Sequence, residues 1–163
     1  MIVNIKNKDT IVIGDFKLKC CVGKNGIHQN KIEGDKKTPK GIFKLGELYW
    51  RPDRVEKPIT KLKCIKIRKN MGWCNDSNSG YYNKRIKLPK KIGHEKLFRN
   101  DHKYDYFILL KYNYLKVKKN KGSAIFIHLT KNYKPTDGCV AMLKKDFLIF
   151  IKLINKNCSL NLN

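Results

Sequence analysis

The feature that most constrains the fold of this chain is a succession of short β-type segments separated by turn residues. β-Branched or alternating apolar residues fill positions 1–5, 10–13 and 16–22, with Asn-Lys-Asp and Gly-Asp turns between them. Turns this short predict hairpins between neighbouring strands. A turn-rich stretch at 34–41 then leads into a further expected strand at 42–45. The N-terminal part is therefore predicted to form a β-sheet.

The C-terminal half continues the β pattern and adds one helix. Aromatic and β-branched residues at 104–113 predict a buried strand, and residues 123–128 predict the next one. Residues 144–154 are too apolar for a solvated strand and long enough for a helix, with Asp146 favourable near its start. The more polar stretch at 51–89 is interpreted as an ordered insertion or cover. We therefore expect a mainly β fold with one helix packed against it.

The length of the chain fits one domain over residues 1–163, because a chain of this size can bury roughly two-thirds of its unfolded surface. There is no run of 18 apolar residues, so no transmembrane segment is expected. The opening residues, 1–6, have a strand-like pattern, and we recognise no signal peptide in them.

The formal net charge of +24 is extreme, and such values are usually associated with attraction to nucleic acid, anionic membranes or polyanionic polymers. Lysine recurs along the whole chain, however, instead of clustering in one basic helix or arm, and no nucleic-acid-binding motif accompanies it. We interpret the charge as a solvated basic surface and expect no nucleic-acid partner. A non-enzymatic module that binds polyanions is the alternative, and salt would abolish such binding.

The six cysteines form no Cys-x-x-Cys pair and have no metal-ligand spacing with the histidines, so we expect no zinc site. If one cysteine serves chemistry, five remain. An odd number fits a reducing compartment or buried free thiols better than the paired cysteines of a secreted scaffold.

His128 and Cys139, eleven residues apart, are the candidate catalytic pair. A free thiol has a pKa of about 8.5 and is only slightly ionised at neutral pH, so a nucleophilic cysteine needs a group that takes its proton. Strand alternation points His128 to the same face as Phe126, at the end of the expected strand. His128 is therefore the predicted base for Cys139.

The residues before the thiol suit a turn that binds substrate. Gly138 leaves room for a carbonyl group to approach Cys139, and backbone N–H groups of the turn are candidates to hold the developing oxyanion. Thr136 and Asp137 are expected to shape this turn. Taken alone, the pattern also fits an ordinary buried cysteine and a core histidine.

Three motifs occur in order along the chain. They are Gly34-Asp35-Lys36-Lys37-Thr38-Pro39-Lys40-Gly41-Ile42-Phe43, then Ile127-His128, and then Thr136-Asp137-Gly138-Cys139-Val140. Together they resemble the L,D-transpeptidase catalytic domain of bacterial peptidoglycan enzymes. Two further pieces, at 70–76 and 94–99, resemble a short, single-domain branch of that family. The likeness extends from about residue 23 to the final helix.

The resemblance implies an L,D-transpeptidase-like β-sandwich and a role in cell-wall biogenesis and cell shape. By analogy, Cys139 forms a thioester with the diamino-acid residue at position three of a stem tetrapeptide and releases D-alanine, while His128 moves the proton. An amine then accepts the peptide, or water does, which gives carboxypeptidase activity. No metal or nucleotide cofactor is needed. The implied partners are peptidoglycan stem peptides, and the implied location is the periplasm or cell envelope, although without a visible signal peptide a cytoplasmic location also fits.

The chain departs from the family at two positions near the thiol. Many members have a His before the Gly-Cys pair and an Arg two residues after the cysteine, where this chain has Asp137 and Ala141. Because that Arg is tied to substrate or oxyanion handling, Lys144, Lys145 and Arg99 are the candidates to replace it. A papain-like peptidase or amidase is another interpretation of a Cys–His pair, but in that group the cysteine precedes the histidine.

Several other residues have simpler expected roles. Asp35 and Thr38 are predicted to hold the turn that precedes the strand at 42–45. Trp73 and Tyr82 lie in the polar stretch and are expected to anchor it to the core, in preference to lining a peptide groove. Glu95 is a further candidate for the site, whereas the neighbouring His94 is expected to be structural or exposed.

Overall fold

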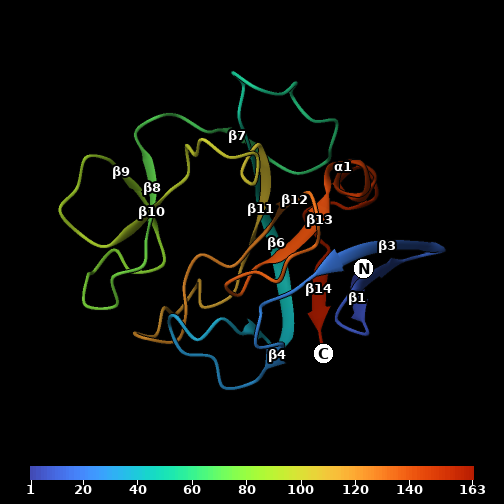
Figure 1. The fold of residues 1–163 in the computed structure, drawn as a ribbon, viewed down its shortest axis with the longest axis horizontal. Coiled ribbons are helices and arrows are strands. Elements are labelled where there is room, and N and C mark those ends of the chain that lie inside the picture. The colour runs from blue at the N-terminus through green and yellow to red at the C-terminus, as the bar shows by residue number, and fades with distance from the viewer.

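The computed structural model describes residues 1–163 and is mainly β, with one short helix (Figure 1). The first strands are β1 (Ile2–Lys6), β2 (Thr10–Ile13), β3 (Phe16–Cys21), β4 (Ile27–His28), β5 (Thr38–Pro39) and β6 (Gly41–Trp50). The middle of the chain contains β7 (Cys64–Lys66), β8 (Met71–Cys74), β9 (Arg85–Lys87), β10 (His94–Lys96) and β11 (Tyr106–Leu110). The C-terminal part contains β12 (Phe126–Thr130), β13 (Val140–Leu143), α1 (Lys144–Leu153) and β14 (Ser159–Leu162).

Nine strands form one sheet, in the order β11-β12-β13-β3-β2-β1-β14-β6-β7, and an additional pairing of β6 with β11 closes it into a ring. The ten-residue β6 makes this closure possible because residues 41–44 pair with β14 and residues 45–50 pair with β11. The hairpins predicted between β1, β2 and β3 are confirmed, since both pairs are antiparallel. β1 also pairs in parallel with β14, which brings the two ends of the chain side by side (Figure 1).

The main hydrophobic core joins the strands of the ring to α1. Phe147, Phe150 and Ile151 of the helix are fully buried in this cluster, and Phe147 stacks on Tyr106 of β11. The helix ends one residue before the predicted limit. Asp146 lies in the first turn and Lys152 in the last, where each of these two charges favours the helix dipole.

A second, aromatic cluster lies on the other face of β11 and β12. Phe107 stacks on Tyr49 of β6, and Phe126 packs against both Phe107 and Trp73. Trp73 comes from the small sheet β10-β8-β9, which appears apart from the ring on the left of Figure 1. The Trp73 indole N–H donates to the Asn83 side-chain oxygen at 2.9 Å. The expectation that Trp73 anchors the insertion to the core is therefore confirmed.

The strand expected at 123–128 begins three residues later and ends two residues later, at Phe126–Thr130. Ala124 has a φ of +52°, which an extended strand does not allow, and its N–H donates to the Asn83 side chain instead of a strand partner. His128 consequently lies in the middle of the strand and not at its end, which corrects the sequence prediction. The strand predicted at 104–113 is likewise shorter, at Tyr106–Leu110, and the one predicted at 42–45 is longer, at Gly41–Trp50.

The ten-residue α1 is the only helix in the structure, and no helix is long and apolar enough to cross a membrane.

The last strand of the chain, β14, provides a test of the core. Leu160 of β14 is fully buried between β1 and β6, whereas Leu115 is 92% exposed. Because Leu160→Ala removes buried methyl groups and leaves a cavity, we expect the free energy of unfolding to fall by about 2–5 kcal/mol in denaturant titrations. The matched variant Leu115→Ala is expected to change it by less than about 0.5 kcal/mol. Equal losses in the two variants would contradict the described core.

Candidate active site

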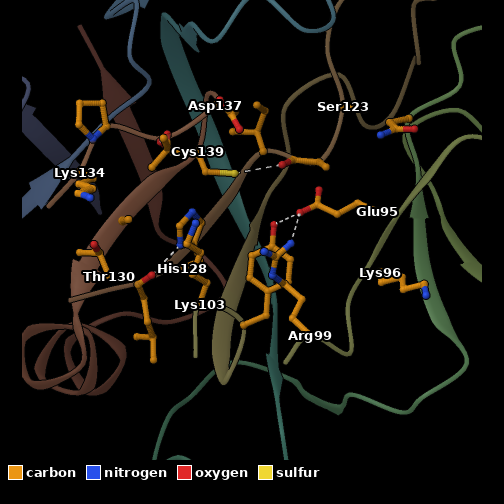
Figure 2. Close-up of a pocket in the computed structure, with 18 of the residues that line it drawn as sticks. Glu95, Lys96, Arg99, Lys103, Ser123, His128, Thr130, Lys134, Asp137 and Cys139 are labelled. Atoms are coloured by element: carbon orange, nitrogen blue, oxygen red, sulfur yellow. Dashed lines mark hydrogen bonds and ion pairs between the residues drawn. The ribbon is translucent and has the colours of Figure 1, made fainter. Parts of the chain in front are cut away.

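The parallel pairing of β12 and β13 determines where Cys139 lies. Ile127 is opposite Val140, so the residue just before β13 falls beside Phe126 at the start of β12. The Cys139 sulfur accepts a hydrogen bond from the Phe126 backbone N–H at 3.3 Å and donates to the carbonyl oxygen of Ala124 at 3.2 Å. Figure 2 shows the sulfur directed across the cavity along the second of these bonds. The thiol is therefore held between two backbone groups.

The turn before Cys139 is fixed by two threonines. Thr136 Oγ1 accepts the N–H of Gly138 at 3.1 Å and donates to the Cys139 carbonyl oxygen at 2.5 Å. Thr38, which is fully buried, donates to the Gly138 carbonyl at 2.8 Å and accepts the N–H of Gly23 at the same distance. Thr38 thus joins the turn before Cys139 to Gly23, and neither hydrogen bond of its hydroxyl lies within the 34–41 turn that it was predicted to hold.

Gly138 is required at its position for two reasons. Its φ is +134°, a conformation that residues with a side chain rarely adopt, and a Cβ added there would lie 2.8 Å from the Lys37 carbonyl oxygen. Its N–H is already used by Thr136, so it is not free to hold an oxyanion. The Cys139 N–H, in contrast, donates to no acceptor within the protein. Asp137 lies at the rim with a side chain that is 90% exposed, and contributes little to the shape of the turn.

A buried lysine lies beneath this turn. Lys31 is only 4% exposed, and its ammonium group forms an ion pair with Asp35 at 2.7 Å. Asp35 also accepts the backbone N–H groups of Ile32 and Lys37, so it holds its own turn as predicted. The ammonium group lies close to Gly138, and its charge lowers the pKa of the Cys139 thiol. Lys31 was missed from the sequence because lysine is almost never buried without a partner.

His128 is buried and has a defined tautomer. Its Nδ1 is 2.9 Å from the carbonyl oxygen of Leu129, and because a carbonyl only accepts, Nδ1 carries the proton. Nε2 makes no hydrogen bond within the protein and is free to accept a proton. Burial lowers the pKa of His128 to about 4, so the imidazole is neutral at neutral pH.

Cys139 is also neutral in the resting structure. Burial raises the pKa of its thiol to about 12, with a further rise from the nearby Glu95 carboxylate. His128 and Cys139 line the same cavity, as Figure 2 shows, but no hydrogen bond joins the sulfur to the imidazole. The structure therefore brings the predicted pair into one cavity while the thiol proton faces Ala124.

The cavity has a volume of about 770 Å³ and is mostly polar, with six hydrophobic residues among the 25 that line it. Thr136, Asp137, Cys139 and His128 all belong to its lining. This volume lies in the range of roughly 300–1,000 Å³ typical of ligand pockets. A polar cavity of this size suits a peptide substrate.

The cavity wall opposite the turn before Cys139 contains Glu95, Arg99 and Tyr104. The Tyr104 hydroxyl donates to Glu95 Oε1, and its ring lies 5.6 Å from the His128 imidazole between centroids. Burial raises the pKa of Glu95 and that of Tyr104. Tyr104 was predicted only as a strand residue, so its place in the site was missed.

Of the three basic residues considered as replacements for the family arginine, only Arg99 lines the cavity, while the other two, Lys144 and Lys145, begin α1 and point to solvent. Ala141, which occupies the family position, is fully buried opposite His128.

All six cysteines are free thiols. No group of three or more His, Cys, Asp or Glu side chains is arranged to hold a metal ion.

Comparison with known proteins gives one match. A family model for the L,D-transpeptidase catalytic domain, YkuD, matches residues 1–159. No curated protein and no solved structure matches the chain. Because the family model covers nearly all of the 163 residues, the chain belongs to the YkuD family of L,D-transpeptidase catalytic domains.

Proposed function

We propose that this protein is a peptidoglycan L,D-transpeptidase that uses Cys139 as nucleophile and His128 as base. The observation that carries the proposal is the placement of both side chains in one polar cavity by the pairing of β12 with β13. The free Nε2 of His128 supplies the acceptor that thiol attack requires, and the Cys139 sulfur faces the cavity in which a substrate carbonyl would lie. Membership of the YkuD family supports this reaction.

In the first half-reaction, the thiol leaves its hydrogen bond to Ala124 and passes its proton to Nε2 of His128. The sulfur attacks the carbonyl carbon of the diamino-acid residue at position three of a stem tetrapeptide. The backbone N–H of Cys139, which has no acceptor in the protein, holds the oxyanion. The C–N bond then breaks, His128 returns the proton to the departing amine, and D-alanine leaves. The product is a thioester on Cys139.

In the second half-reaction, an acceptor amine attacks the thioester, His128 takes a proton from that amine, and the restored thiol leaves as the new amide forms. Water in place of the amine gives L,D-carboxypeptidase activity. Dividing one amide exchange into two acyl transfers lowers each barrier, and neither transfer calls for a cofactor.

The proposal includes the architecture and the setting of the enzyme. We propose that residues 1–163 act as one catalytic domain, in which the closed ring is a β-sandwich of the L,D-transpeptidase type with α1 packed on it. Peptidoglycan stem peptides are the proposed partners, and the bacterial cell envelope is the proposed location. The proposed biological role is in cell-wall biogenesis and cell shape.

Acylation of the thiol tests the proposed function directly. Intact-mass measurement after incubation with a stem tetrapeptide or a carbapenem is expected to give an adduct on the wild-type protein and none on Cys139→Ala. His128→Gln is expected to form the adduct about 100-fold more slowly, because the thiol loses its proton acceptor. Cys64→Ala, which removes another partly exposed cysteine, serves as the matched control and should react like wild type. An adduct on Cys139→Ala, or an unchanged rate in His128→Gln, contradicts the assignment.

The pH dependence of alkylation tests the resting protonation state. A thiol with a pKa of about 12 is ionised in proportion to hydroxide concentration, so its reaction with iodoacetamide is expected to rise about tenfold per pH unit from pH 6 to 9 without a plateau. Alkylation is measured by mass spectrometry of the peptide that contains Cys139. A rate that is already constant above pH 7 would mean that the free enzyme holds a thiolate–imidazolium pair.

A further inference from the structure

Two hydrogen-bonding atoms remain unused side by side in the cavity wall. Oε1 of Glu95 accepts the Tyr104 hydroxyl, whereas its Oε2 makes no hydrogen bond within the protein. Arg99 donates from Nε and Nη2 to the Asp101 carboxylate, whereas its Nη1 donates to no acceptor. Figure 2 shows the two side chains meeting at the centre of the cavity, across from Cys139 and His128. An acceptor and a donor therefore lie next to each other where substrate binds.

The Glu95 carboxylate and the Arg99 guanidinium attract each other but form no hydrogen bond with each other. Nη1 of Arg99 lies 3.9 Å from Oε1 of Glu95, which is longer than a hydrogen bond. Both side chains are about 30% exposed, so each is partly desolvated and still open to the cavity. Asp101 fixes the guanidinium plane through its two other nitrogens, which orients the free Nη1 in advance.

We propose that Glu95 and Arg99 together bind an α-amino-acid zwitterion, with the ammonium group on Glu95 and the carboxylate on Arg99. This inference rests on the proposed function and deepens it. The ligand group has two possible sources in that reaction: the side-chain end of the donor's diamino-acid residue, if that residue carries both groups, or the acceptor amino acid whose amine attacks the thioester.

A zwitterion fits this pair better than either charge alone. A lone ammonium group on Glu95 is repelled by Arg99 and by the cavity lysines Lys96 and Lys103, and a lone carboxylate on Arg99 is repelled by Glu95. When both groups sit on one carbon, each meets its opposite charge and the two repulsions are offset. The pair also places a guanidinium in the cavity of a chain that has Ala141 at the position of the family arginine.

Binding to a protein that cannot react tests the pair separately from catalysis. The probes are stem tetrapeptides with a diamino diacid at position three, whose side-chain end is free, acetylated on the amine, or amidated on the carboxylate. Affinities for Cys139→Ala are measured by nuclear magnetic resonance titration, with and without Glu95→Gln or Arg99→Lys. Glu95→Gln keeps an acceptor for Tyr104, and Arg99→Lys keeps the positive charge beside Asp101.

If the donor is the source, Glu95→Gln is expected to weaken the free peptide about tenfold and leave the acetylated one unchanged. Arg99→Lys is then expected to weaken the free peptide and leave the amidated one unchanged. Glu33→Gln is the matched control, because Glu33 lines the same cavity and accepts a tyrosine hydroxyl from Tyr82 but has no arginine partner. In this control the ratio of affinities for the free and acetylated peptides should match that of the parent.

If the acceptor amino acid is the source of the zwitterion, the affinities for the donor peptides stay unchanged. The substitutions then affect the second half-reaction instead. With Cys139 restored, transfer of the acyl group to a free amino acid is then expected to fall about tenfold in Glu95→Gln, while transfer to the corresponding amino-acid amide falls less. An equal loss of affinity or of acyl transfer for all probes, or no loss in either half-reaction, overturns the inference. Zwitterion-selective binding by Cys139→Ala without any thioester on wild type would instead refute the proposed function and leave the binding pair in place.

Discussion

The parallel pairing of β12 with β13 is the constraint on which the site depends. Parallel neighbours normally need a connection of a dozen or more residues, yet here only positions 131–139 lie between the two strands. Because this connection is so short, the whole of it lies close to the ends of the two strands. Its last residue, Cys139, therefore lies next to Phe126. The buried hydroxyl of Thr38 then fixes this connection to the N-terminal part of the ring. The path of the chain and one buried threonine thus set the position of Cys139.

The same burial that positions the pair also keeps both groups uncharged. Two neutral groups, a thiol with a raised pKa and an imidazole with a lowered one, occupy the cavity before substrate arrives. The largest cause of both shifts is desolvation, which disfavours charge on either group. Substrate entry changes this balance most effectively if it brings positive charge toward Glu95, because that carboxylate is the second cause of the high thiol pKa. Under the proposed binding of an ammonium group by Glu95, substrate recognition and thiol activation are linked through this one side chain.

The sequence predicts those features of the fold that depend on local pattern. Alternation placed Ile127 and Phe126 on opposite faces, and they indeed belong to the two separate hydrophobic clusters. The helix was located to within one residue for the same reason. Beyond the N-terminal hairpins, strand partners were not predicted, because the parallel pairings join segments whose contact has no local signature. The start of β12 was misplaced because the positive φ of Ala124 depends on Asn83, about forty residues away.

The candidate site likewise contains residues that the local sequence predicts and residues that it does not. Cys139 and His128 stand out because few other residue types perform this chemistry, and Gly138 because its backbone conformation excludes side chains. Lys31 pairs with Asp35, four residues away, and lies near the thiol only because its ammonium group is close to Gly138, while Tyr104 enters the site through its contact with Glu95. The chain has a net charge of +24, so a carboxylate that lines this cavity carries the opposite charge to most of the groups around it. Under the proposed zwitterion binding, the Glu95 carboxylate receives the ammonium group beside Cys139, while the lysines and the arginine that line the cavity keep its lining net positive.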